Sequence, residues 1–140
     1  MTRREMVIEL RKEARSLLKE YGIKVSREKF ISSVGRAWVD GNKSIIKIPP
    51  LTTIRHIYVA FHEIAHVIKD HHNENTKKEY LQEYEAERWA LNKLREFGVD
   101  SFFPIDYKEI EQDAKRYVFS YMVQEKTQIP DRVKNWILKF

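Results

Sequence analysis

The sequence predicts an α+β domain that is mostly helical and has a small antiparallel β-sheet or hairpin packed beside one buried helix. Hydrophobic residues recur at three- and four-residue spacings over several long stretches, and two short β-rich runs flank a turn sequence. One segment, residues 57–68, is apolar on every side of a helix except at a few positions. With 140 residues, 42% of them hydrophobic, we expect a single domain over residues 1–140, with helical residues 106–140 as its extension.

The first predicted element is an amphipathic helix over residues 3–21, in which apolar residues alternate with charged ones at helical spacing. Gly22 is expected to end this helix, because glycine adopts left-handed backbone at little cost. Beyond it, Ser26 can cap a brief helical turn towards Ile31.

A β-hairpin is predicted next. Residues 34–39 and 44–48 are rich in β-forming side chains, and the Asp-Gly and Gly-Asn pairs between them favour a tight turn. Pro49 and Pro50 end the second strand, because proline cannot donate a hydrogen bond within a sheet.

Helices are predicted for most of the remaining chain. Thr52 or Thr53 can cap the helix that contains residues 57–68, and the polar stretch after Asp70 indicates a loop. Gly98 is expected to end the helix before it, and Pro130 is expected to open the last helix. The three later helices are predicted over residues 77–97, 106–125 and 133–140.

Residues 61–66, FHEIAH, contain two histidines four positions apart, with a glutamate after the first. On a helix, His62 and His66 lie one turn apart on the same face, so each can offer a nitrogen to the same ion. This H-E-x-x-H pattern is typical of zinc metallopeptidases, where Glu63 would take a proton from the attacking water. The alternative is a pair of core histidines beside a stray glutamate. Burying these groups without partners is costly, so their place in an apolar helix indicates a site.

A tetrahedral zinc site needs a third protein ligand and keeps its fourth position for water. Glu83 is the first candidate. Glu87 lies one turn further on, and the small side chains of Ala86 and Ala90 would let this helix approach the metal helix closely. In that arrangement Glu87 would not bind the metal itself. It would orient a ligating histidine by accepting a hydrogen bond from the ring nitrogen that faces away from the metal.

His72 is the alternative third ligand, since it follows His62 by ten residues as in the longer H-E-x-x-H-x-x-G-x-x-H pattern. That pattern turns sharply at its glycine, where this chain has Lys69. A straight helix would carry His72 about 15 Å from His62 along the axis. A different carboxylate is the remaining alternative.

The composition excludes several other kinds of site. The chain has no cysteine, so disulfides, cysteine-ligated metal and cysteine catalysis are ruled out. The net charge of +5 is a small excess in a chain rich in both signs, and no nucleic-acid-binding motif is recognisable, so direct nucleic-acid binding is not favoured. Neither a signal peptide nor a membrane-spanning run is evident, which predicts a cytoplasmic protein.

The order of these elements, with LLKEYGI, HEIAHVIKDHH and EYEAERWA, resembles the ImmA/IrrE family of zinc metallopeptidases over about residues 8–97. The resemblance implies a zincin-like, more specifically gluzincin-like, fold and one zinc ion per chain, held by His62, His66 and Glu83, with Glu63 as catalytic base. Glu87 stands where relatives often have Asp or Asn. Members are often encoded on phages and mobile elements and act on a DNA-binding repressor, so the resemblance implies such a protein substrate.

The predicted function is therefore that of a zinc metalloendopeptidase acting on a specific protein. The strand at residues 44–48 is a candidate for pairing with an extended peptide substrate. The alternative is a non-catalytic, zinc-containing regulatory or binding module that acts on a protein partner or nucleic acid.

Overall fold

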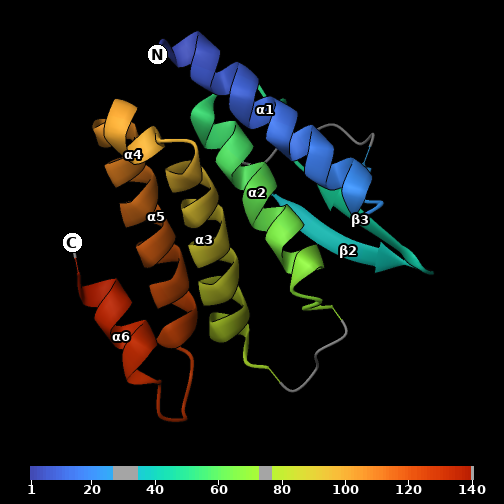
Figure 1. Ribbon diagram of the computed structural model, residues 1–140. Helices are drawn as coiled ribbons and strands as arrows, with labels where there is room; N and C mark the ends of the chain where they lie inside the picture. The colour runs from blue at the N-terminus through green and yellow to red at the C-terminus, as the bar shows by residue number, and fades with distance from the viewer. Residues whose placement is uncertain (27–34, 73–76, 140) are drawn as a thin grey trace.

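The computed structural model describes residues 1–26, 35–72 and 77–139. It confirms the α+β class, with mostly helical structure and one small sheet (Figure 1). The elements, in chain order, are α1 (Arg3–Glu20), β1 (Lys24–Val25), β2 (Arg36–Asp40), β3 (Lys43–Lys47), α2 (Ile54–Ile68), α3 (Glu79–Glu96), α4 (Val99–Phe102), α5 (Pro104–Met122) and α6 (Asp131–Leu138).

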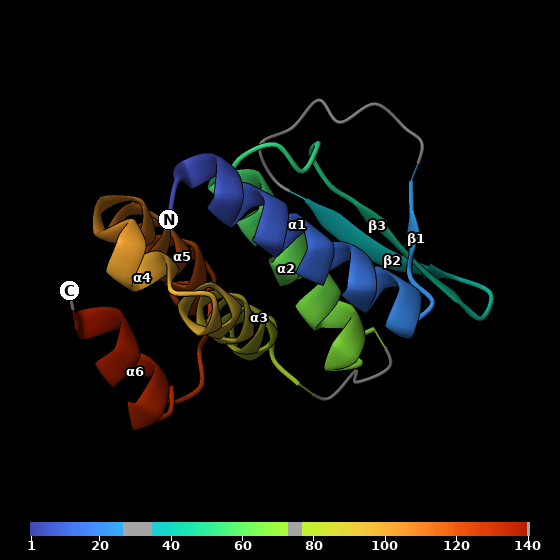
Figure 2. The ribbon, with the colours of Figure 1, turned by 45° about the horizontal axis from the view of Figure 1, so that its top comes forward.

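Helix α2 lies at the centre of the fold. Helices α1 and α3 pack against it, and strands β2 and β3 contact it as well, as Figures 1 and 2 show from two directions. Helix α2 begins at Thr53, whose side chain accepts a hydrogen bond from the backbone N–H of His56 at 3.0 Å. Ten of its fifteen residues are buried, which confirms the prediction of a buried helix.

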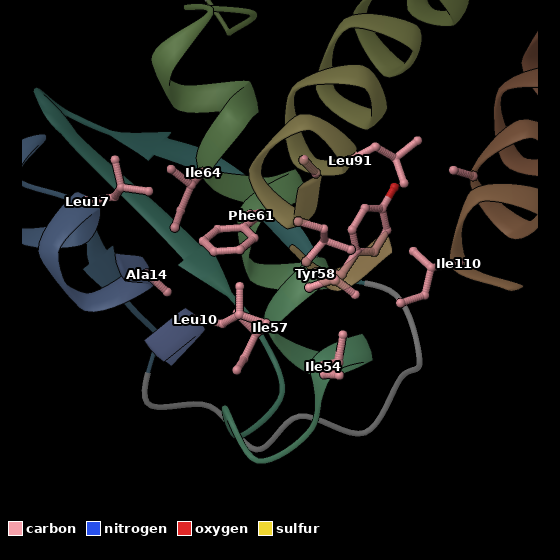
Figure 3. Close-up of a cluster of buried hydrophobic side chains, with 14 of the residues drawn as sticks. Leu10, Ala14, Leu17, Ile54, Ile57, Tyr58, Phe61, Ile64, Leu91 and Ile110 are labelled. Atoms are coloured by element: carbon pink, nitrogen blue, oxygen red, sulfur yellow. The ribbon is translucent and has the colours of Figure 1, made fainter. Parts of the chain in front are cut away.

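The main hydrophobic core forms around α2. Figure 3 shows Phe61 and Ile57 of α2 beside Leu10 of α1, while Tyr58 lies towards Leu91 of α3. Phe61 is completely buried, and truncating such a side chain to alanine typically costs about 3–5 kcal/mol. This packing fixes the position of α2 against both neighbouring helices, which is what holds its polar residues in place.

The sheet has three strands in the order β1-β3-β2 and is mixed. The β2–β3 hairpin was predicted and turns at Gly41, whose φ is +65°. The prediction of a purely antiparallel sheet is wrong, because β1 pairs in parallel with β3. Strand β3 is thus central: β2 pairs with residues 43–47 on one side, and β1 pairs with Ile45 and Ile46 on the other, so these two residues offer no free edge to a peptide. Among the described strands, the free edge next to α2 belongs to β2.

The helix boundaries agree closely with those predicted. Helix α1 ends before Gly22 and α3 before Gly98, and both glycines have positive φ. The four-residue α4 was not predicted. The predicted turn from Ser26 towards Ile31 lies outside the described residues. No described helix combines the length and apolar character needed to cross a membrane.

A smaller hydrophobic cluster joins α6 to α3 and α5. It consists of Tyr80, Val118, Val133 and Ile137, with Trp136 packed against both this cluster and the main core. Helix α6 therefore packs against α3 and α5.

Candidate metal centre

His62 and His66 lie one turn apart on α2, and their rings meet edge to face with centroids 4.7 Å apart. The two Nε2 atoms are only 3.1 Å apart, and both histidines are buried. Two imidazole nitrogens at this distance need a proton or a cation between them. The H-E-x-x-H spacing has therefore brought two possible ligand atoms to one point inside the protein.

Glu83 of α3 adds a third atom at the same point. Its Oε2 lies 3.0 Å from His62 Nε2 and 3.3 Å from His66 Nε2. In a tetrahedral zinc site with ligands at about 2.0–2.1 Å, neighbouring ligand atoms are about 3.3 Å apart. The three residues therefore fit a metal ion, and their nitrogen and oxygen donors are ones that zinc accepts.

The charge on Glu83 is matched to the two histidines. Burial opposes ionisation of Glu83, but hydrogen bonds and charge interactions with His62 and His66 outweigh it and lower the pKa to about 2. This carboxyl group is therefore ionised at neutral pH, as a metal ligand must be.

Glu63 is buried on the same helix and does not join the converging atoms. Burial raises its pKa to about 7, with opposing effects from the charges of His66 and Glu83. The residue before β2, Gly35, lies directly against it: a β-carbon built there would be 2.8 Å from Glu63 Cγ. Only glycine leaves room for the Glu63 side chain in its observed position.

Glu87 lies behind His62, one turn after Glu83 on α3. Its Oε1 is 2.9 Å from His62 Nδ1, on the side of the ring opposite the converging atoms. Burial, together with the charge of Asp113, raises the pKa of Glu87 to about 8. Glu87 Oε1 and His62 Nδ1 are thus within ion-pairing distance, although the contact does not have the geometry of a hydrogen bond.

His71 lies behind His66, a position that sequence reasoning missed. Its Nδ1 is 2.8 Å from His66 Nδ1, and its Nε2 is 2.8 Å from Glu85 Oε1. The sequence had indicated only a loop after Asp70 here. One signal was present, because Asp70 is among the few residues that tolerate the left-handed backbone that a sharp helix end requires.

Two adjoining hollows, of about 160 and 230 Å³, open beside the converging atoms. Both are lined by Gly35, His62, Glu63 and Tyr117, so Glu63 lies where they meet. His72, the alternative third ligand, lines the larger hollow but is not part of the converging group. The arrangement thus has a candidate ligand set, a buried carboxyl group beside it and room for a small part of a substrate.

Tyr117 of α5 places a phenol at this cleft, with its ring centroid 5.9 Å from that of His62. Its hydroxyl is 3.2 Å from that of Tyr121. Burial and the negative charge of Glu83 raise the pKa of Tyr117 well above its usual value, so the hydroxyl keeps its proton and can donate.

Comparison with protein-family models, curated proteins and solved structures finds no match to this chain. The molecule is thus an α+β protein with a buried group of two histidines and one glutamate that can hold a metal ion.

Proposed function

We propose that this chain is a zinc-dependent metallopeptidase with a gluzincin-like fold that hydrolyses peptide bonds in a specific protein. The observation that carries the proposal is the convergence of His62, His66 and Glu83 beside Glu63 at the cleft. Zinc held by the three ligands would supply a Lewis acid, which makes a water molecule acidic enough to lose a proton near neutral pH.

Glu63 would act as the general base and then as the general acid. Its carboxylate would accept the proton of the attacking water and then deliver it to the amine that leaves the cleaved peptide bond. A pKa of about 7 suits both roles, because the group can take up and release a proton at neutral pH. Its burial beside Gly35 limits the number of positions that the carboxylate can adopt.

Tyr117 would stabilise the negative charge that develops on the carbonyl oxygen. It lines both hollows with Glu63, and its hydroxyl remains protonated for the reason given above. Fixed donors aimed at developing charge are usually among the largest contributions to catalysis.

The free edge of β2 would bind the substrate backbone. Arg36 and Ala37, at the start of β2, line the larger hollow together with Glu63. An extended peptide that pairs with this edge would therefore run past the catalytic base. The resemblance to the ImmA/IrrE family supports a narrow protein substrate, such as a DNA-binding repressor encoded on a phage or mobile element.

Metal analysis and a cleavage assay with a proteome-derived peptide library, read by mass spectrometry, test the proposal. The purified protein should contain about one zinc per chain. Glu63→Gln should keep that zinc and lose about 100-fold or more of the turnover, while His66→Ala should lose the zinc. Cleavage that persists unchanged in Glu63→Gln, or a protein that binds no metal, would rule the proposal out.

A hollow on another part of the surface favours a second candidate, a non-catalytic module that binds an anionic partner such as nucleic acid. Four arginines and two acidic residues line this hollow of about 660 Å³ between α1, the start of α2 and α5: Arg3, Arg4, Arg11, Arg55, Asp106 and Glu109. Arg3 and Arg55 are paired with Asp106 and Asp113, so Arg4 and Arg11 are the arginines that no acidic side chain is shown to neutralise among the described residues. On this reading a labelled DNA duplex should bind the purified protein, less tightly after Arg4→Ala and at higher salt. Any biological effect of the protein should then survive Glu63→Gln.

A further inference from the structure

A continuous line of contacts runs from His66 to the surface through two residues that the proposed reaction does not use. His66 Nδ1 meets His71 Nδ1, and His71 Nε2 meets Glu85 Oε1, each at 2.8 Å. Both Glu85 oxygens lie 3.1 Å from Lys77 Nζ. His71 is only 5% exposed, so its ring is enclosed between these partners.

The end of α2 builds this arrangement through its backbone. Asp70 adopts left-handed backbone, with φ +57°, immediately after the helix. The N–H of His71 then bonds to the carbonyl of His66 at 3.1 Å, and the N–H of Asp70 bonds to the carbonyl of Val67 at 3.0 Å. These two bonds define a Schellman motif, which turns the chain back over the last helical turn. This turn places His71, and not His72, in contact with the ring of His66.

The contacts fix the position of every proton once His66 binds a metal through Nε2. The lone pair of His66 Nε2 is then bound to the metal, so His66 carries its proton on Nδ1. From there it donates a hydrogen bond to His71 Nδ1. Because His71 Nδ1 must accept, its own proton lies on Nε2 and is donated to Glu85. All hydrogen bonds along the line therefore run in one direction, from the metal ligand to the carboxylate.

We propose that His71 and Glu85 are positioning residues that orient His66 and hold its Nε2 lone pair towards the metal. The inference rests on the metal site proposed above, but not on its peptidase activity. Glu87 Oε1 lies 2.9 Å from His62 Nδ1, whereas His66 Nδ1 meets a second imidazole before a carboxylate is reached. Each metal-binding histidine is therefore connected to a carboxylate of α3, and the connection of His66 depends on the helix end that Asp70 shapes.

Zinc affinity, measured by competition with a chromophoric chelator, and the visible spectrum of the cobalt(II)-loaded protein test this role. Loss of a partner that orients a ligating histidine typically weakens metal binding about 10–100-fold, and we expect this for His71→Leu. His71→Asn should recover much of the affinity, because its amide oxygen can accept the proton of His66 Nδ1. The cobalt spectrum of His71→Leu should shift as the orientation of His66 changes.

Glu85→Gln provides a second variant, whose side chain is partly exposed and whose fold is less at risk. It should weaken zinc binding less than His71→Leu, and adding it to His71→Leu should cause little further loss, because the line is already broken. Matched controls are Glu79→Gln in the first turn of α3 and His56→Leu near the start of α2, both expected to bind zinc normally. Thermal unfolding of the metal-free proteins checks that each variant folds.

The outcomes separate this inference from the proposed function. If the parent binds zinc but His71→Leu and Glu85→Gln bind it equally well with unchanged cobalt spectra, the positioning role is overturned while the peptidase proposal stands. If the parent binds zinc, His71→Leu weakens it and His71→Asn restores it, the role is supported even where no peptide is cleaved. A parent chain that binds neither metal overturns both.

Discussion

Gly35 and Glu63 are in such close contact that a β-carbon on Gly35 would lie 2.8 Å from Glu63 Cγ and 2.9 Å from its Oε2. The same β-carbon would lie 2.9 Å from Val59 Cγ1, so Glu63 cannot move aside freely within this packed region. The segment that leads into β2 therefore forms one wall of the space that the proposed base occupies. This contact makes the position of the carboxylate depend on a residue 28 positions earlier in the chain.

Gly35→Ala is expected to reduce turnover by about 100-fold, because a shift of about 1 Å in a catalytic group can cost that much. Zinc content should stay at one per chain, since the three atoms nearest to the new methyl group belong to Glu63 and Val59 and not to the ligands. The overpacking should also lower the free energy of unfolding by about 1–3 kcal/mol. Gly22→Ala is the matched control: it is strained by its positive φ but has nothing nearby, so turnover should be unaffected.

Glu83→Gln is expected to weaken zinc binding strongly, whereas His72→Leu should change the zinc dissociation constant by no more than about threefold. The reason is that Glu83 Oε2 lies within 3.3 Å of both histidine nitrogens, while His72 is outside this group. Isothermal titration with zinc measures both variants. The opposite ranking would make His72 the third ligand and Glu83 a bystander.

Much of the site could be predicted because its ligands follow helical spacing. His62 and His66 share a face of α2 in any intact helix, and Glu83 and Glu87 do the same on α3. The small residues Ala86 and Ala90 are completely buried, in agreement with the predicted close approach of these two helices. Local periodicity was therefore enough to indicate which side chains share a helix face, and the small residues indicated which faces of α2 and α3 meet.

The parts that could not be predicted depend on contacts between distant residues. Strand β1 is only two residues long and pairs with residues about 20 positions later, so neither length nor pattern identified it. The contact of His71 with His66 depends on a non-glycine residue, Asp70, adopting left-handed backbone. Such a conformation is uncommon, and the sequence alone favoured a straight continuation or a loop.

Tyr117→Phe is expected to reduce kcat by about 100–1000-fold with little change in KM, because the lost hydroxyl would act mainly on charge that develops in the transition state. Zinc affinity should not change, since Tyr117 is not among the converging ligands. Steady-state kinetics on the best library peptide measures the effect. Tyr121→Phe removes the neighbouring hydroxyl and should have a much smaller effect, and equal activity of Tyr117→Phe and the parent would exclude the role.

Zinc is expected to stabilise the fold, because it would bind a site assembled from α2 and α3 that the unfolded chain lacks. At a free zinc concentration 100 times the dissociation constant, the gain is about 2.7 kcal/mol. Differential scanning calorimetry with zinc and with a chelator should therefore give a higher Tm in zinc. His66→Ala should show no difference between the two conditions, and a parent protein with the same Tm in both would contradict metal binding.

Ala37→Pro tests whether the edge of β2 binds the substrate backbone. The turn at Gly41 joins Asp40 to Lys43 as a hydrogen-bonded pair, so alternation along the hairpin directs the N–H of Ala37 away from β3. Proline at this position removes a donor to the substrate without breaking the hairpin, and kcat/KM should fall about tenfold or more while zinc content is kept. Val39→Pro changes the same edge at a residue that does not line the cleft, so its loss should be smaller at a similar Tm. Unchanged kcat/KM in Ala37→Pro would mean that the substrate binds elsewhere in the cleft.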